Sequence, residues 1–139
     1  MNALFCTKHD ELHHVPDPPG KPLLMGFTSR SVNLSWAPSF DTHHSPVLNY
    51  IIHTRVGENG EWDSYNGFAT LDNKTNHYVD KLQPFTVYSF RVLAVNAIGT
   101  SQPGKESYYM VTLREGNRCN DCLFSTGFAN AWRLKTVEI

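Results

Sequence analysis

The amino-acid sequence predicts an all-β protein folded as a seven-stranded, two-sheet sandwich. Short stretches that alternate apolar and polar side chains recur along residues 15–115, and turn-forming residues separate them. No window of helical length keeps a 3.6-residue apolar period, because Pro or Gly interrupts each candidate. The 139 residues leave room for one domain of about 100 residues and two tails.

The first 22 residues are expected to lead into the sheet. Residues 1–14 are polar and show no periodicity, which indicates a disordered lead. Residues 15–22 hold four prolines, which forbid a helix and favour an extended segment. We interpret this segment as a linker that enters an edge strand.

Two strands with clear alternation follow the linker. Residues 31–36 place Trp36 on the inner face, and Pro38 ends this strand because proline cannot donate to a ladder. Residues 47–55 form the next strand, with Tyr50 on its inner face.

The later strands are read in the same way. The turn signal at residues 57–60 precedes a strand over 61–68, and a short strand is expected over 73–80. The longest alternation runs over residues 86–96, and residues 107–113 close the set. Residues after 115 do not match the pattern and are expected to form a C-terminal tail over 116–139.

Composition excludes several classes of function. Charged residues make up 18% of the chain and the formal net charge is −1, so no basic field attracts nucleic acid. No stretch is long and apolar enough to span a bilayer, and the first residues lack the apolar core of a signal peptide. Any membrane association is therefore expected through a parent protein.

The three cysteines, Cys6, Cys119 and Cys122, lie outside residues 15–115, so the core is expected to fold without a disulfide. With His9, they have the ligand types and local spacings of a Cys₃His zinc site. A whole domain separates the two halves of this set, which favours free thiols. We therefore expect no metal and no cofactor.

No catalytic arrangement is found either. Asp41, His43, His44 and Ser45 are neighbours in one predicted loop. A nucleophile and its base have to converge from a rigid scaffold, with a third group orienting the base. A solvated loop is the preferred interpretation, and the chain is not expected to be an enzyme.

Residues 82–99 follow the pattern Leu-x-Pro-x-Thr-x-Tyr-x-Phe-x-Val-x-Ala-x-Asn-x-x-Gly. Together with the proline pair at 18–19, Trp36 and Tyr50, this pattern resembles a fibronectin type III domain over residues 15–115. The resemblance implies an immunoglobulin-like sandwich. It also implies that Tyr88 acts as a tyrosine corner, with a packed ring and a hydroxyl bound to upstream backbone. The structural core candidates are Trp36, Tyr50, Leu82, Tyr88 and Phe90.

A closer resemblance is to the fibronectin repeats of the sidekick cell-adhesion family, carried by residues 84–91, 95–101 and 60–62. Dscam-like adhesion proteins and receptor tyrosine phosphatases have similar repeats. The resemblance implies a non-catalytic interaction or spacer module in the extracellular part of a cell-surface protein. Its partners would be proteins, either neighbouring repeats or cell-surface partners, including homophilic contact in the parent protein. The alternative is a cytoplasmic scaffold module, as in muscle-type proteins.

Two sequons are candidates for glycosylation, Asn33-Leu-Ser and Asn73-Lys-Thr. Asn33 alternates with inward apolar residues, so its side chain is expected to point outward. Asn73 is expected in a loop. Occupancy of either site requires a secretory route and would separate the adhesion hypothesis from the scaffold alternative.

Pleat geometry predicts that five apolar residues point outward, opposite the core, and in the sandwich that the resemblance implies their three strands are neighbours in one sheet. A contiguous apolar patch of this kind indicates a partner surface. The alternative is scattered surface residues covered by the stems of Arg55 and Arg91. The interaction-surface candidates are Ile51, Leu93, Val95, Tyr109 and Val111.

Residues 15–115 are expected to fold alone. A fragment limited to these residues should unfold in one cooperative transition in urea, at the same midpoint with and without reductant, because all three cysteines lie outside it. Circular dichroism of the fragment and the full chain provides the measurement. A midpoint that falls on adding reductant, or that rises with zinc in the full chain alone, would contradict this expectation.

Overall fold

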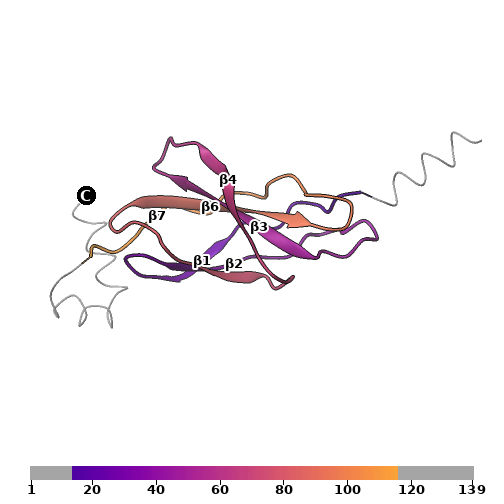
Figure 1. Cartoon of the computed structure of the whole chain (residues 1–139), viewed down its shortest axis with the longest axis horizontal. Coiled ribbons are helices and arrows are strands. Elements are labelled where there is room, and N and C mark those ends of the chain that lie inside the picture. The colour runs from indigo at the N-terminus through magenta and orange to yellow at the C-terminus, as the bar shows by residue number, and fades with distance from the viewer. Residues whose placement is uncertain (1–13, 116–139) are drawn as a thin grey trace, which may run out of the picture.

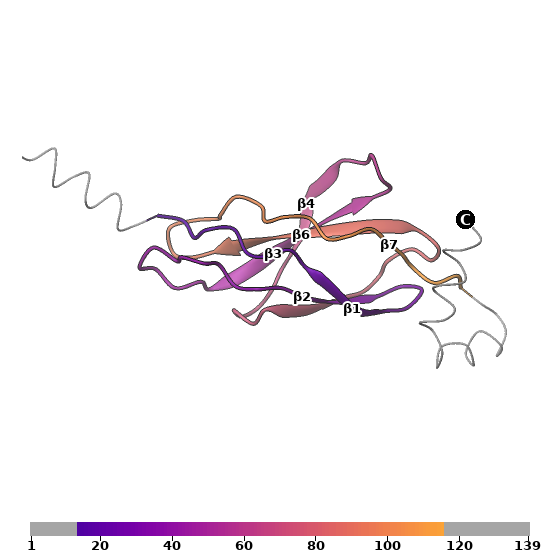
Figure 2. The same cartoon turned by 180° about the vertical axis from the view of Figure 1, so that it is seen from behind.

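The computed structural model describes residues 14–115 of the chain, and these form a sandwich of two antiparallel sheets (Figures 1 and 2). All regular elements of this part of the chain are strands, so the predicted all-β, seven-stranded class is confirmed. The expectations for residues 1–13, for residues 116–139 and for the three cysteines lie outside the described residues. Within residues 14–115, no helix has the length and apolar character needed to cross a membrane.

The smaller sheet has three strands in the order β1-β2-β5. They are β1 (Leu23–Phe27), β2 (Val32–Ser35) and β5 (Asn76–Val79). The inner side chains of β2 are buried and its outer ones are exposed or half-buried, as a strand with one face on the core requires. A bulge between Leu24 and Gly26 shifts the register of β1 on β2.

The larger sheet has four strands in the order β4-β3-β6-β7. They are β3 (Asn49–Val56), β4 (Trp62–Ala69), β6 (Val87–Val95) and β7 (Met110–Val111). β3 pairs with β6 without interruption over its whole length. These two central strands therefore carry most of the sheet.

The core lies between the sheets and is mainly apolar. Trp36 and Tyr50 make an edge-to-face contact, with ring centroids 5.3 Å apart. Phe90, Ile52 and Val92 have no exposed surface. The buried cluster consists of Val32, Leu34, Trp36, Tyr50, Ile52, Val79, Leu82, Tyr88, Phe90, Val92, Ala94 and Met110. All five structural core candidates lie within it.

Tyr88 closes the loop that connects the two sheets. Its ring is buried, and its hydroxyl oxygen accepts a hydrogen bond of 2.7 Å from the backbone N–H of Gln83. The link is made five residues upstream, where the chain passes from β5 to β6. This is the tyrosine-corner geometry that the sequence resemblance implies.

The last strand is shorter than predicted. The sequence indicates a strand over residues 107–113, whereas β7 contains two residues. Ser101, Gly104 and Ser107 instead donate their backbone N–H groups to carbonyls of β6, at distances of 2.7 to 2.9 Å. Contacts at every third residue do not form a regular antiparallel ladder, because hydrogen-bonded residues in such a ladder recur every second residue.

Serine side chains replace part of the missing ladder. The hydroxyls of Ser101 and Ser107 accept the N–H groups of Ala94 and Phe90, each at 2.9 Å. The backbone of β6 is thus paired along both edges, although residues 101–109 are irregular. Sequence alternation does not reveal this arrangement, because it depends on the partner strand.

Tyr88→Phe is expected to lower the free energy of unfolding by about 1 kcal/mol, because it removes one hydrogen bond and leaves a backbone N–H without its acceptor. Urea unfolding of the full chain provides the measurement. Ser89→Ala removes another buried hydroxyl of β6, one that accepts a hydrogen bond of 3.2 Å from Arg55, and so tests whether loss of any such hydroxyl has the same effect. Unchanged stability in Tyr88→Phe would show that the hydroxyl does not hold the loop.

Candidate interaction surfaces

The structure places the predicted interaction residues on the outer face of the four-stranded sheet. Ile51 pairs with Leu93 across β3 and β6, and Val111 pairs with Val87 across β6 and β7. Val95 is two residues beyond Leu93 on the same strand and therefore faces the same side.

Leu93 is nevertheless not part of a solvent-exposed patch. Its side chain is 7% exposed, whereas Tyr109 is 48% exposed and the other three candidates are half-buried. β6 lies between β3 and residues 101–107, so flanking side chains cover a leucine at its centre without any partner protein. The sequence predicts a contiguous exposed apolar surface that includes Leu93, and the structure corrects this prediction because Leu93 is buried.

Arginine and tryptophan form the most distinctive cluster on this face. Arg55 pairs directly with Trp62 across β3 and β4, and its guanidinium carbon lies 4.6 Å from the ring centroid. The guanidinium carbon of Arg91 lies at the same distance from the same ring. Each such contact contributes about 0.5–1 kcal/mol at a partly exposed site. The cluster holds a large aromatic side chain in one orientation on the face.

The edge of this cluster is polar. Arg55 forms an ion pair of 3.1 Å with Glu106 and a hydrogen bond of 3.2 Å with Ser89. Its guanidinium also lies 5.7 Å from the ring of Tyr109, whose hydroxyl donates to the carbonyl of Glu58 at 3.2 Å. The sequence predicts the two arginines only as cover for apolar residues and does not indicate their convergence on Trp62. Only the strand register brings these residues together.

His53 lies beneath Arg91 on the same face. Its side chain is almost fully buried, and its Nδ1 accepts a hydrogen bond of 3.2 Å from Nε of Arg91. Burial, together with the positive charge of Arg91, lowers the pKa of His53 below its ordinary value. The neutral imidazole is therefore the form that the folded protein favours.

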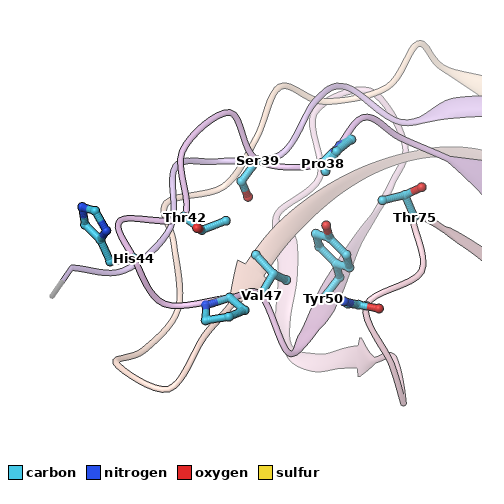
Figure 3. Close-up of a pocket in the computed structure, with 9 residues that line it drawn as sticks. Pro38, Ser39, Thr42, His44, Val47, Tyr50 and Thr75 are labelled. Atoms are coloured by element: carbon cyan, nitrogen blue, oxygen red, sulfur yellow. The ribbon is translucent and has the colours of Figure 1, made fainter. Parts of the chain in front are cut away.

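A second candidate is an open cleft of about 610 Å³ at one end of the sandwich (Figure 3). Its lining combines loop residues with the edge of the core, and Tyr50 points its hydroxyl toward Pro38 and Ser39. Ser39 Oγ is buried without a hydrogen-bond partner among the described residues. The lining residues are Pro38, Ser39, Thr42, His44, Pro46, Val47, Tyr50, Asn73 and Thr75.

The loop containing Asp41, His43, His44 and Ser45 is joined to the N-terminal segment through His43 and Asp17. His43 contacts carboxylates, with Nε2 3.0 Å from Asp17 and Nδ1 3.8 Å from Asp41. The hydrogen bond to Asp17 raises the pKa of His43. Within residues 14–115, no group of three or more His, Cys, Asp and Glu side chains is arranged to hold a metal ion.

Both sequon asparagines are exposed. Asn33 lies on the outer face of β2, and Asn73 lies in the loop between β4 and β5, where it also contributes to the end cleft. Neither position requires a change of fold to carry a large substituent.

Comparison with known proteins agrees with the geometry. The family model of the fibronectin type III domain matches residues 17–110. The chain is 60% identical over 101 residues to the protein named receptor-type tyrosine-protein phosphatase mosPTP-1 of Aedes aegypti, covering 73% of the chain and 8% of that relative. It is 44% identical over 101 residues to protein sidekick-2 of Gallus gallus, covering 71% and 4%.

A solved structure of domains A168–A170 from titin superposes with a TM-score of 0.64 at 30% identity, over 72% of the chain and 33% of that structure. The chain therefore belongs to the fibronectin type III family. Its sequence relatives include cell-adhesion and receptor-type proteins, and the resemblance to sidekick is confirmed. The chain spans less than a tenth of the length of the two relatives described.

His53 and His43 are expected to change stability with pH in opposite directions. Because the pKa of His53 is lowered, its contribution is complete above the unfolded value of about 6.5 and is lost as the pH falls below it. Because the pKa of His43 is raised, its contribution is complete below about 6.5 and is lost as the pH rises through the folded value.

Urea unfolding at pH 5.5 and pH 7.5 tests both signs. The free energy of unfolding of His53→Gln, relative to that of the unmodified chain, should be higher at pH 5.5 than at pH 7.5. The reason is that glutamine keeps an acceptor for Arg91 and does not gain a charge at low pH. His43→Gln should show the reverse. Equal pH profiles for the two variants would contradict the assignment.

Proposed function

We propose that this chain is a non-catalytic interaction and spacer module of a cell-adhesion or receptor protein, and that it acts in the extracellular part of that protein. The observation that carries the proposal is the 60% identity to a receptor-type protein over the length of the domain. The 44% identity to a sidekick protein supports the same class. Partners would be neighbouring repeats or cell-surface proteins, with homophilic contact included.

The shape of the domain supports a spacer role. The first and last described residues lie at opposite ends of its long axis (Figures 1 and 2). Repeats of this kind form a rod when they follow one another, because the chain enters each domain at one end and leaves it at the other. The domain thus acts as a spacer between the domains on either side of it in a parent protein.

The outer face of the four-stranded sheet is the surface we propose for partner contact. Trp62, Tyr109 and the two arginines of the cluster are residue types that carry most binding energy in protein interfaces. A partner that presents carboxylates beside a flat apolar side chain would suit the positive charge and the exposed aromatic edge. In this view Leu93 supports the face from below and makes no contact itself.

A module without catalysis fits the chemistry of the described residues. The histidines with shifted pKa values bind Asp17 or Arg91, and these pairs account for the shifts through hydrogen bonding and burial. The match to the phosphatase relative covers 101 residues and 8% of that relative, and the fibronectin type III model matches residues 17–110 of this chain.

The second candidate function is a cytoplasmic scaffold module. The observation that favours it is the structural similarity to titin domains. In that setting the same face would contact a neighbouring intracellular domain, and the sequons would remain unmodified.

Binding of the full chain, coated on beads, to the surface of live cells tests the proposed function. Tyr109→Glu is expected to weaken binding at least tenfold, because it replaces an exposed aromatic ring of the proposed contact with a charge. Leu71→Glu is the matched control, because Leu71 is fully exposed in the loop between β4 and β5 and is not among the residues of the proposed contact. Circular dichroism verifies that both variants are folded.

Equal loss of binding in both variants, or no binding to any cell surface, would contradict the adhesion proposal. Bead-to-bead aggregation in the same assay reports homophilic contact, and it should show the same dependence on Tyr109. Leu93→Glu is unsuitable for this purpose, because a charge at a buried position is expected to unfold the domain.

A further inference from the structure

The outer face of the three-stranded sheet brings a sequon asparagine and an exposed tyrosine into direct register. Asn33 of β2 pairs with Tyr78 of β5, so both side chains point away from the core on the same side. In an antiparallel pair, the Cβ atoms of directly opposed residues lie about 4.5–5.5 Å apart. The sequence alone does not show this pairing, because 44 positions separate the two residues.

Apolar groups on this face are left without cover from the described chain. Tyr78 is 56% exposed, Met25 is 64% exposed and Leu23 is 54% exposed. Leaving such surface in water forgoes roughly 25 cal/mol per Å² of potential burial. The face therefore has room and a physical reason for a covering group.

Space beside Asn33 is open on its other flank. Asn33 pairs with Gly26 of β1, and a side chain added at Gly26 would meet nothing within 4 Å. A large substituent on Asn33 can thus lie flat on the sheet, over Gly26 on one side and Tyr78 on the other. The bulge in β1 also lies at this point, between Leu24 and Gly26.

We propose that Asn33 carries an N-linked glycan whose first sugar packs on the ring of Tyr78 and covers this face. The first sugar of such a glycan, N-acetylglucosamine, presents a row of C–H groups on one side of its ring, and this apolar side matches an exposed aromatic ring. The inference rests on the proposed extracellular function, because the modification requires a secretory route.

The modification itself is a glycosyl transfer from a polyisoprenyl diphosphate-linked oligosaccharide. The bond from the sugar C1 to the diphosphate oxygen breaks, and a bond from C1 to Asn33 Nδ2 forms. The amide nitrogen loses one proton, and the lipid diphosphate leaves with the bonding electron pair. Ser35 completes the sequon that the transferring enzyme reads.

This glycan would decide which face meets proteins. A sugar chain rooted at the middle strand of the three-stranded sheet blocks flat contact with another protein there. The outer face of the four-stranded sheet, with Trp62 and Tyr109, then remains available. The proposal thereby gives the two faces of one sandwich different roles.

The second sequon provides a matched control. Asn73 lies in the loop between β4 and β5, outside the strand ladders, so no cross-strand residue opposes it in the described register. A glycan at Asn73 has no defined relation to Tyr78. If a glycan at Asn33 is coupled to Tyr78 and a glycan at Asn73 is not, the coupling depends on the cross-strand pairing and not on glycosylation in general.

The test uses the full chain secreted from a eukaryotic cell line that makes high-mannose glycans, trimmed enzymatically to one N-acetylglucosamine per site. Mass spectrometry of glycopeptides gives the occupancy of Asn33 and Asn73. A double-mutant cycle of Asn33→Gln with Tyr78→Ser then measures coupling by urea unfolding. The single sugar at Asn33 should raise the folding equilibrium constant about fivefold, as expected for a favourable cross-strand pair, and Tyr78→Ser should abolish this gain.

Two variants separate stacking from general effects. Tyr78→Phe should keep the fivefold gain, because the ring remains. The cycle of Asn73→Gln with Tyr78→Ser should show no coupling. An unoccupied Asn33 in the folded, secreted chain would overturn the proposal, as would an occupied Asn33 with no coupling to Tyr78.

Failure of the glycan proposal can be distinguished from failure of the proposed adhesion function. Cell-surface binding that depends on Tyr109 can be present when Asn33 is unmodified, and this result would reject the glycan and leave the adhesion proposal standing. Glycan coupling without cell-surface binding would reject the adhesion role and leave the glycan standing. Asn33→Gln should not reduce binding through the four-stranded face.

Discussion

The uninterrupted pairing of β3 with β6 is the constraint on which the rest of this structure depends. Eight consecutive residue pairs fix which side chains of both strands point inward. A slip of β6 by one residue relative to β3 would turn Phe90 toward solvent and Arg91 toward the core, which would expose an aromatic ring and bury a charge. Once this register is set, the core, the outer face and the position of Tyr88 follow.

The same register explains why the outer face combines stability and exposure. Arg91 lies opposite His53, and Arg55 lies opposite Trp62 on the next strand, so three strands contribute to one cluster. Aromatic and guanidinium groups can pack against each other and still present a polar edge to water. A face built in this way remains ordered in the isolated domain, which is the property a preformed interaction surface needs.

The two faces of the sandwich differ in the chemistry that they present. The four-stranded sheet carries clustered arginines around a half-buried tryptophan, whereas the three-stranded sheet carries a sequon among exposed apolar side chains. In a rod of repeats, each domain has neighbours at both ends, so lateral partners meet its sides, where these two faces are the broad surfaces. The division we propose, glycan on one and protein on the other, follows from that difference.

The sequence by itself determined the fold class, the inner residues and the tyrosine corner, because these depend on local alternation and on a pattern within residues 82–99. It did not determine the burial of Leu93, the short β7 or the convergence of two arginines on Trp62. Alternation tells which side of a strand a residue occupies, but its exposure and contacts depend on the neighbouring strands. Those neighbours come from distant parts of the chain, so only the tertiary structure decides them.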